Sequence, residues 1–257
     1  MFIDKEKLGQ LVKHADQTLP PGKLASKLIP LLDLTNLNEG ASQEDIAQLC
    51  AAAQTDLGPT AAICIEAKFL ELARQLLKNT TIKLATVVNF PSGNAPLPET
   101  LAEIATAINN GAHEIDLVMP YQDFLAGKRP QVASYIEACH RECGETVLLK
   151  VILETGALDN TETIYEAARL AIDAGAGFIK TSTGKIRVGA SLEAAACMLL
   201  AIKDSGRNVG FKAAGGVRTP AQAAAYLSLV ENILGLDCVV PERLRIGASS
   251  LLQELLG

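Results

Sequence analysis

The sequence lacks the marks of a membrane-bound or exported protein. No stretch approaches the roughly 18 consecutive apolar residues of a membrane-spanning helix. The first residues, MFIDKEKLGQLVKHADQT, carry too many charges to form the apolar core of a signal peptide. Both absences predict a cytoplasmic protein that has no membrane partner.

Cysteine pairs and histidine clusters are also missing. No cysteines form a C-x-x-C pair, so we interpret them as buried free thiols in a reducing compartment. The cysteines lie at positions 50, 64, 139, 143, 197 and 238. The histidines, His14, His113 and His140, have no metal-ligand spacing, and we expect no metal site. No dinucleotide-binding glycine motif and no serine elbow are present, so we expect no cofactor and no serine nucleophile.

The net charge and the length of the chain further limit the class of protein to which it can belong. The formal net charge is −6, which argues against a nucleic-acid partner because nucleic acid needs a basic face. A small anionic substrate is still compatible, since a few converging cations can dominate a pocket locally. The chain has 257 residues and 49% hydrophobic content, enough for a large core. An α/β barrel often uses about 250 residues as one domain.

A short apolar run followed by an amphipathic run recurs along the chain. The spacing of about 30 residues matches one βα repeat. The predicted strands are 31–34, 61–65, 84–88, 114–119, 147–152, 178–181, 209–213 and 244–247. Strands that alternate with helices in this number predict an α/β fold, a single (β/α)₈ TIM barrel. The alternative is an open doubly wound sheet.

Local signals mark helices between these strands. Ser42 and Asp45 resemble a capping box, and the apolar residues of 46–53 then recur at helical spacing. Gly111 is a typical residue after a helix end. The first residues, up to about 22, predict a helix closed by Pro20-Pro21-Gly22. We therefore predict an N-terminal helical extension over 1–25 and a catalytic barrel over 26–257.

Lysines inside apolar strands are the most informative feature. They are Lys150, Lys180 and Lys212, on three consecutive predicted strands. A buried lysine is costly unless it is paired, so packing alone rarely explains one. Neighbouring barrel strands should bring the three together, and desolvation with like charge then lowers a lysine's pKa. A neutral amine can attack a carbonyl to form an imine. The alternative is that each lysine reaches water or pairs with an acid.

Two acids interrupt apolar strands in the same way. Asp116 lies in the strand that precedes the Lys150 strand, and Asp33 lies in the first strand. Asp116 could balance a buried lysine and shuttle protons through water, and Asp33 could orient a lysine or a substrate hydroxyl. The alternative for Asp116 is a purely structural ion pair. Cys64 is interpreted as a small core residue, and its place on a strand leaves proximity to the pocket open.

Small residues follow the last three predicted strands. Glycine lets backbone N–H groups approach an anion, and barrel enzymes commonly bind phosphate at the loops after strands seven and eight. These ends also provide serines and a lysine, so we predict a phosphate site there. The residues are Thr183, Gly184, Lys185, Gly215, Gly216, Gly247, Ser249 and Ser250.

The chain resembles the deoxyribose-phosphate aldolase family from about Leu31 to its C-terminus. The phrases that carry the resemblance are LDLTNLN (32–38), AICI (62–65), NFPSGN (89–94), EIDLV (114–118), FIKTSTGK (178–185), GFKAAGGVR (210–218) and RIGASS (245–250). The resemblance implies a class I aldolase, a lyase that acts in deoxyribonucleoside catabolism. It would cleave 2-deoxy-D-ribose 5-phosphate reversibly to D-glyceraldehyde 3-phosphate and acetaldehyde.

The resemblance also implies roles for individual residues. Lys180 would form the Schiff base, and Asp116 and Lys212 would transfer protons, with Lys212 lowering the pKa of Lys180. Lys150 and Asp33 would line the site. The residue patterns alone do not choose among the three lysines.

The sequence departs from the family pattern at two places, and two other functions are compatible with its residues. Ala213 stands where the family usually has proline, and the sequence ends at Gly257 without the C-terminal tyrosine of some relatives. The rivals are a Schiff-base aldolase for another phosphorylated sugar and a non-catalytic barrel that binds a sugar phosphate. The expected partners are a sugar phosphate and acetaldehyde, with a homodimer possible.

Overall fold

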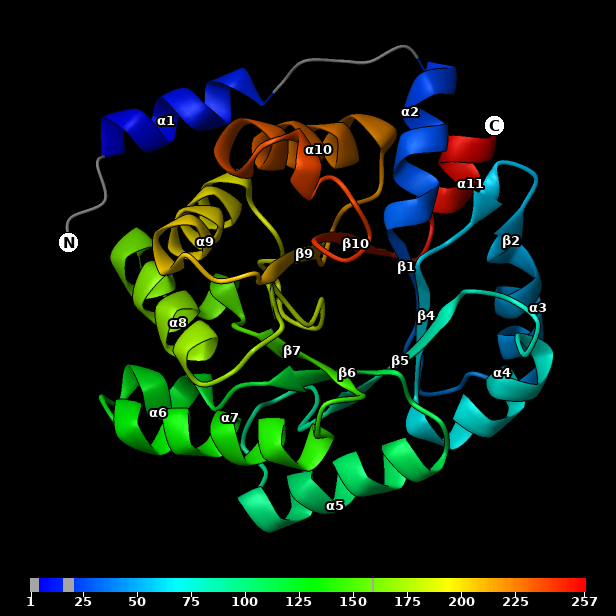
Figure 1. Ribbon diagram of the computed structural model, residues 1–257, viewed down its shortest axis with the longest axis horizontal. Coiled ribbons are helices and arrows are strands. Elements are labelled where there is room, and N and C mark those ends of the chain that lie inside the picture. Colours follow the sequence, from blue (N-terminus) through cyan, green and yellow to red (C-terminus); the bar gives the residue numbers. More distant parts are fainter. Residues whose placement is uncertain (1–4, 16–20, 159) are drawn as a thin grey trace.

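All eight predicted strands form, and each lies parallel to its neighbours in a closed barrel (Figure 1). The computed structural model describes residues 5–15, 21–158 and 160–257. The order around the barrel is β1-β10-β9-β8-β7-β6-β5-β4, and β1 pairs with β4 to close it. The barrel strands are β1 (Leu32–Asn36), β4 (Ala62–Ile65), β5 (Lys83–Val88), β6 (Glu114–Val118), β7 (Leu148–Ile152), β8 (Phe178–Lys180), β9 (Gly210–Ala214) and β10 (Leu244–Ala248).

Helices surround the barrel and bury its outer apolar face, as expected for a (β/α)₈ fold (Figure 1). They are α3 (Gln43–Ala52), α4 (Leu70–Leu76), α5 (Leu97–Asn109), α6 (Tyr121–Leu125), α7 (Arg129–Cys143), α8 (Thr161–Asp173), α9 (Leu192–Ser205), α10 (Pro220–Leu234) and α11 (Leu251–Leu256). The predicted TIM barrel is therefore confirmed. In the part of the chain that the structure describes, no helix is both long and apolar enough to cross a membrane.

Helix boundaries follow the local chemistry of the sequence. At the start of α3, the Ser42 hydroxyl accepts a hydrogen bond from the Asp45 N–H, and the Asp45 carboxylate accepts one from the Ser42 N–H. This is the predicted capping box, which satisfies two backbone donors that the first helical turn leaves unpaired. The helix after β5 ends at Asn109, and Gly111 follows with φ of +98°. Glycine accepts this left-handed backbone without a Cβ clash.

The N-terminal segment differs from its prediction. The structure has two helices there, α1 (Lys5–His14) and α2 (Pro21–Leu28). Pro21 begins the second helix instead of closing the first, because proline lacks only an N–H that the first helical turn leaves unpaired anyway. Residue 20 lies outside the described residues. α1 packs on α9 and α10, and α2 packs on α10 and α11. A short hairpin of β2 (Gln54–Thr55) and β3 (Gly58–Pro59) was not predicted either.

The register of the barrel sets the relative heights of the predicted site residues. Asp116 lies opposite Lys150 across β6 and β7, and Lys180 lies opposite Lys212 across β8 and β9. Lys150, however, lies opposite Phe178 on β8, two residues before Lys180. Side chains two residues apart on a strand point to the same face. Lys150 therefore enters the barrel one layer deeper than Lys180.

Candidate active site

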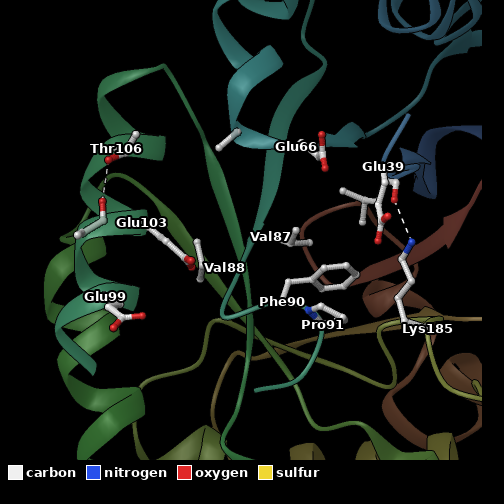
Figure 2. A pocket seen from close by; sticks show the side chains of 13 residues that line it. Glu39, Glu66, Val87, Val88, Phe90, Pro91, Glu99, Glu103, Thr106 and Lys185 are labelled. Carbon is white, nitrogen blue, oxygen red and sulfur yellow. Dashed lines mark hydrogen bonds between the residues drawn. The ribbon is translucent and has the colours of Figure 1, made fainter. Parts of the chain in front are cut away.

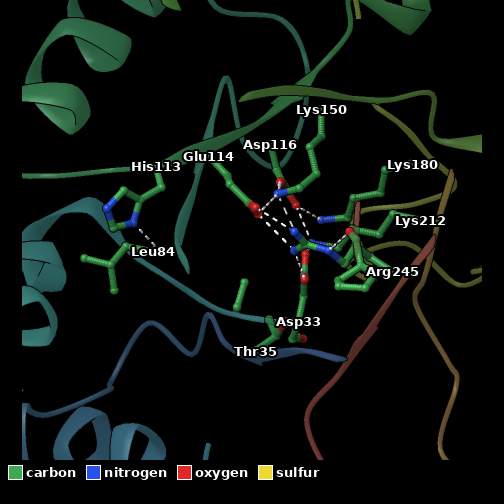
Figure 3. A network of polar contacts seen from close by, with 12 residues as sticks. Asp33, Thr35, Leu84, His113, Glu114, Asp116, Lys150, Lys180, Lys212 and Arg245 are labelled. Carbon is green, nitrogen blue, oxygen red and sulfur yellow. Dashed lines mark hydrogen bonds and ion pairs between the residues drawn. The ribbon is translucent and has the colours of Figure 1, made fainter. Parts of the chain in front are cut away.

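Charged side chains from six barrel strands meet inside the barrel (Figure 3). Each of them is at least nine-tenths buried. Charged groups are costly to bury unless they are paired, so their pairing decides how this cluster behaves. The members are Asp33 (β1), Glu114 and Asp116 (β6), Lys150 (β7), Lys180 (β8), Lys212 (β9) and Arg245 (β10).

Asp116 joins the three lysines. Its Oδ2 accepts hydrogen bonds from Lys180 Nζ and from Lys212 Nζ, both at 2.7 Å. Its Oδ1 accepts one from Lys150 Nζ at 2.8 Å. The three lysines that the sequence placed on neighbouring strands therefore converge on one carboxylate. A proton can pass between Asp116 and an amine at these distances without movement of the backbone.

Arg245 supports the opposite side of the cluster. Its guanidinium bonds to Asp33 Oδ1 at 2.7 Å and to Glu114 Oε1 at 2.8 Å. Asp33 and Glu114 in turn pair with lysines: Asp33 Oδ2 lies 2.5 Å from Lys212 Nζ, and Glu114 Oε2 lies 2.6 Å from Lys150 Nζ. The planar guanidinium thus fixes two carboxylates at once, and those carboxylates fix two of the lysines.

The charges of the cluster do not balance when every member is ionised. Four cations face three carboxylates, so loss of one proton from a lysine would leave the cluster neutral. Lys180 has the fewest acidic partners, because Asp116 is its one ion-pair partner among the described residues. Lys150 and Lys212 each pair with at least two acids.

The pKa values of the lysines differ accordingly. Burial lowers the pKa of Lys180, and the neighbouring Lys212 lowers it further, although Asp116 partly opposes both. Burial acts in the same direction on Lys212, but Asp116 and Asp33 outweigh it and raise its pKa. Asp116 and Glu114 likewise raise the pKa of Lys150 above its ordinary value against the effect of burial. Lys180 is therefore the lysine of the three that is poised to act as a neutral amine.

Asp116 stays ionised in this environment. Burial alone would raise the pKa of its carboxyl, but the three lysines lower the pKa well below its usual range. Asp33 behaves in the same way, since Lys212, Arg245 and Lys150 together outweigh burial and lower its pKa. Both carboxylates are therefore ionised at neutral pH in the resting site.

A cavity of about 290 Å³ opens from Lys180 to the loops that follow β8, β9 and β10. Its basic lining residues are Lys180, Lys185 and Arg218, and no acidic residue lines it within the part of the chain that the structure describes. The cavity therefore suits an anionic ligand, because nearby cations favour a negative group. Its other lining residues are Thr35, Asn36, Leu37, Asn38, Thr183, Gly184, Ala214, Gly215, Gly216, Val217, Gly247, Ala248 and Ser249.

Two of the loops around this cavity touch backbone to backbone. A Cβ on Gly189 would lie 2.2 Å from the carbonyl oxygen of Gly215, so no larger residue fits there without a shift. The Ala190 N–H donates to the same oxygen at 2.8 Å. Gly215 and Gly216 have φ of +89° and +93°, a conformation that suits glycine. Glycine thus lets the loop after β8 hold the loop after β9 in place.

Figure 2 shows a larger cavity of about 670 Å³. It shares Leu37 and Lys185 with the first cavity. Lys185 Nζ donates to the Leu37 carbonyl oxygen at 3.0 Å at this boundary. The larger cavity is bordered by Glu39, Glu66, Glu99 and Glu103. This acidic border repels anions, so an anionic ligand belongs in the smaller cavity.

Comparison with known proteins agrees with this geometry. Residues 27–250 match the family model described as DeoC/LacD family aldolase. The chain belongs to this family. It is 49% identical over 237 residues to a deoxyribose-phosphate aldolase of Agrobacterium fabrum, a match that covers 92% of each chain.

Solved structures of aldolases have the same fold as this DeoC/LacD family member. The deoxyribose phosphate aldolase of Aeropyrum pernix matches with a TM-score of 0.76 and 25% identity, covering 99% of this chain and 97% of that one. The aldolase QR15 matches with a TM-score of 0.75 and 29% identity, covering 89% of this chain and 96% of that one.

The structure of this family member brings most of the predicted site residues together, in two layers. Lys180 is the one predicted catalytic residue that reaches the cavity, and Asp116, Lys212, Lys150 and Asp33 lie buried beneath it. The predicted phosphate-binding residues line the cavity, except Ser250, which is exposed just before α11. Cys64 is fully buried, and burial raises the pKa of its thiol, which keeps it in the unreactive protonated form.

Sequence reasoning missed Glu114, Arg245 and Arg218. Arg245 interrupts an apolar strand just as the three lysines do, so the same rule could have found it. Glu114 shares the face of Asp116, two residues away, and period-two alternation could have found it. Arg218 lies in a quoted phrase but gave no signal of its own. Across the described residues, no group of three or more His, Cys, Asp or Glu side chains is placed to hold a metal ion.

Proposed function

We propose that the chain is a deoxyribose-phosphate aldolase, a lyase that uses Lys180 as its Schiff-base nucleophile. The observation that carries the proposal is the buried Lys180 amine, whose pKa is lowered and which faces a cation-lined cavity. A sugar phosphate needs both features, an amine for its carbonyl and cations for its phosphate. The family and the 49% identical relative support this activity.

The substrate, open-chain 2-deoxyribose 5-phosphate, binds with its phosphate among the loops after β8, β9 and β10. Lys185, Arg218 and the backbone of Gly215 and Gly216 provide the positive surroundings there. The C1 aldehyde then lies at Lys180, which borders the same cavity. The neutral amine adds to C1, and the resulting carbinolamine takes up a proton from the Asp116–Lys212 group and loses water to give the iminium.

Asp116 and Lys212 then manage the protons. Asp116 Oδ2 bonds to both Lys180 and Lys212, so a water molecule beside this group can take the proton from the C3 hydroxyl while it passes one of its own to Asp116. The C2–C3 bond breaks, its electron pair moves into the iminium, and glyceraldehyde 3-phosphate leaves. Protonation of the resulting enamine at C2 and hydrolysis then release acetaldehyde and regenerate Lys180. The reverse sequence forms the bond.

The cellular setting is part of the proposal. The six cysteines are buried and unpaired, which suits a reducing compartment, and we place the enzyme in the cytoplasm in deoxyribonucleoside catabolism. A homodimer remains our expectation for its assembly.

The test combines turnover with trapping. The protein is assayed for glyceraldehyde 3-phosphate release from 2-deoxyribose 5-phosphate, next to Lys180→Ala and a control, Lys128→Ala, whose lysine is exposed on the surface. Borohydride reduction in the presence of substrate should give a covalent adduct that peptide mapping places on Lys180. We expect Lys180→Ala to lose turnover and adduct, and the control to keep both. An adduct on Lys150 or Lys212 would refute the assignment.

Two further measurements address the rival functions. A panel of phosphorylated sugars separates this substrate from others, because the same lysines would serve any of them. Ligand binding without turnover or adduct would indicate a non-catalytic barrel instead.

A further inference from the structure

Glu154 is a buried carboxylate that the proposed chemistry leaves without a role. It lies two residues after the end of β7 and is fully buried, with an exposed fraction of 0%. Its backbone has φ of +54° and ψ of +56°, the left-handed region that side-chain-bearing residues rarely adopt. Glycine would adopt this conformation more readily. A buried acid at a strained position is typical of a residue held for function rather than for packing.

The carboxylate of Glu154 has one hydrogen-bonding neighbour, Thr183, among the described residues. Oε2 accepts from the Thr183 hydroxyl, and the carboxylate also accepts from the Thr183 N–H at 3.3 Å. Thr183 lines the same cavity as Lys180. The two segments are held together around this contact, because the Thr155 N–H donates to the Thr181 carbonyl oxygen at 2.9 Å.

The hydrogen-bond capacity of the Thr183 hydroxyl is therefore nearly used up. A hydroxyl has one proton to donate and two lone pairs to accept with. Its proton goes to Glu154, and one lone pair accepts from the Lys185 N–H at 3.0 Å. What remains is a single acceptor position. While Glu154 is ionised, Thr183 can thus accept a hydrogen bond from a ligand but cannot donate one.

The order of residues along the loop suggests which substrate group meets this acceptor. Thr183 lies between Lys180, which would hold C1, and Gly184 and Lys185, which border the phosphate region. The substrate hydroxyl between the reacting carbons and the phosphate is the one on C4. It takes no part in the bond cleavage, so its contacts contribute to recognition.

We propose that Glu154 is a positioning residue that fixes the Thr183 hydroxyl as an acceptor for the C4 hydroxyl of the substrate. This inference depends on the proposed aldolase function and adds a determinant of its specificity. Burial raises the pKa of Glu154, and the hydrogen bonds from the Thr183 hydroxyl and N–H are the main effects that oppose this shift.

The experiment compares two substrates that differ only at C4. Acetaldehyde release is measured from 2-deoxyribose 5-phosphate and from 2,4-dideoxyribose 5-phosphate, which lacks the C4 hydroxyl. We expect the unmodified protein to prefer the hydroxylated substrate in kcat/KM by about tenfold or more, because a site built to bond a hydroxyl discriminates against its absence. Thr183→Val should lower that preference to about threefold or less, and Thr183→Ser should keep it.

Two changes at Glu154 then separate positioning from folding. Glu154→Gln keeps the shape but presents an amide that can donate to Thr183, which frees the hydroxyl proton and should remove the preference. Glu154→Gly suits the left-handed backbone and should remove the preference while keeping the thermal midpoint. Combining Glu154→Gln with Thr183→Val should cause no further loss. Glu166→Gln, at an exposed carboxylate paired with Arg129, is the control and should match the unmodified protein.

The outcomes are distinguishable. A preference that persists in the Glu154 variants, or an equal loss of kcat/KM on both substrates, would overturn the positioning role. Absence of any C4 preference in the unmodified protein would overturn it as well. If the unmodified protein releases no acetaldehyde and forms no borohydride adduct, the proposed function itself has failed, and the inference fails with it.

Discussion

Replacement of Lys212 by methionine tests the electrostatic origin of the reactivity that we propose for Lys180. Both ammonium nitrogens lie 2.7 Å from Asp116 Oδ2, so they are at most twice that distance apart. At this separation and an effective dielectric constant of about 20, two positive charges repel by about 3 kcal/mol. Lys212→Met removes that repulsion and leaves Asp116 free to stabilise the ammonium form of Lys180. The neutral fraction of Lys180 should therefore fall.

The magnitude follows from the same estimate. About 3 kcal/mol corresponds to a change on the order of 100-fold in the neutral fraction, and relaxation of the site would reduce it to about tenfold or more. The assay is competitive labelling of amines with a small electrophile at neutral pH, without substrate, followed by peptide mapping. This readout is independent of any part that Lys212 takes in proton transfer.

A second variant should change the labelling rate of Lys180 in the opposite direction. Asp116→Asn removes the group that opposes the lowered pKa, so per folded molecule Lys180 should label at least as fast as in the unmodified protein. Circular dichroism establishes that each variant is folded before its labelling is compared. A labelling rate of Lys180 that is unchanged or raised in folded Lys212→Met would refute the reasoning.

Other predictions concern stability, and each is checked by urea unfolding. The buried Lys180 has a lowered pKa, so its ionisation opposes folding. Lys180→Met should therefore raise the free energy of unfolding by about 1 kcal/mol while turnover is lost. A lower urea midpoint would contradict this. Arg245→Met leaves Asp33 and Glu114 without their shared partner and should cost about 3–5 kcal/mol, an effect that an unchanged midpoint would exclude. The folded-state pKa values of Asp33 and Asp116 are lowered, so their contribution to stability should be complete above pH 3.8, the ordinary pKa of the carboxyl group, and should disappear as the pH falls below it. Asp116→Asn should make the free energy of unfolding less dependent on pH in this acid range.

The barrel strands could be predicted because each is a short apolar run between helical runs. The predicted run 178–181, for example, contains β8 (Phe178–Lys180) almost unchanged. The N-terminal helices could not be placed, because a Pro-Pro-Gly phrase can either end one helix or begin the next. Only tertiary packing on α9, α10 and α11 decides between these possibilities.

Some residues of the candidate site could likewise be predicted from the sequence, and others could not. Lys150, Lys180, Lys212 and Asp116 were predictable because charge inside an apolar strand is rare. The choice of Lys180 among the lysines was not predictable from pattern, since it depends on how many acids each amine meets in space. The role of Glu154 was hidden for another reason: its left-handed backbone and its contact with Thr183 arise from two loops that are 29 residues apart.

The excess of one cation inside the barrel has a consequence beyond the resting enzyme. In the proposed mechanism, an iminium on Lys180 would restore the positive charge that the free amine had given up, so the intermediate would meet the same repulsion as the ammonium. Cleavage of the C2–C3 bond removes that charge, because the iminium becomes an uncharged enamine. The arrangement that would make Lys180 a nucleophile would thus also make its iminium a stronger electrophile, so the same imbalance would assist both the attack on C1 and the later cleavage.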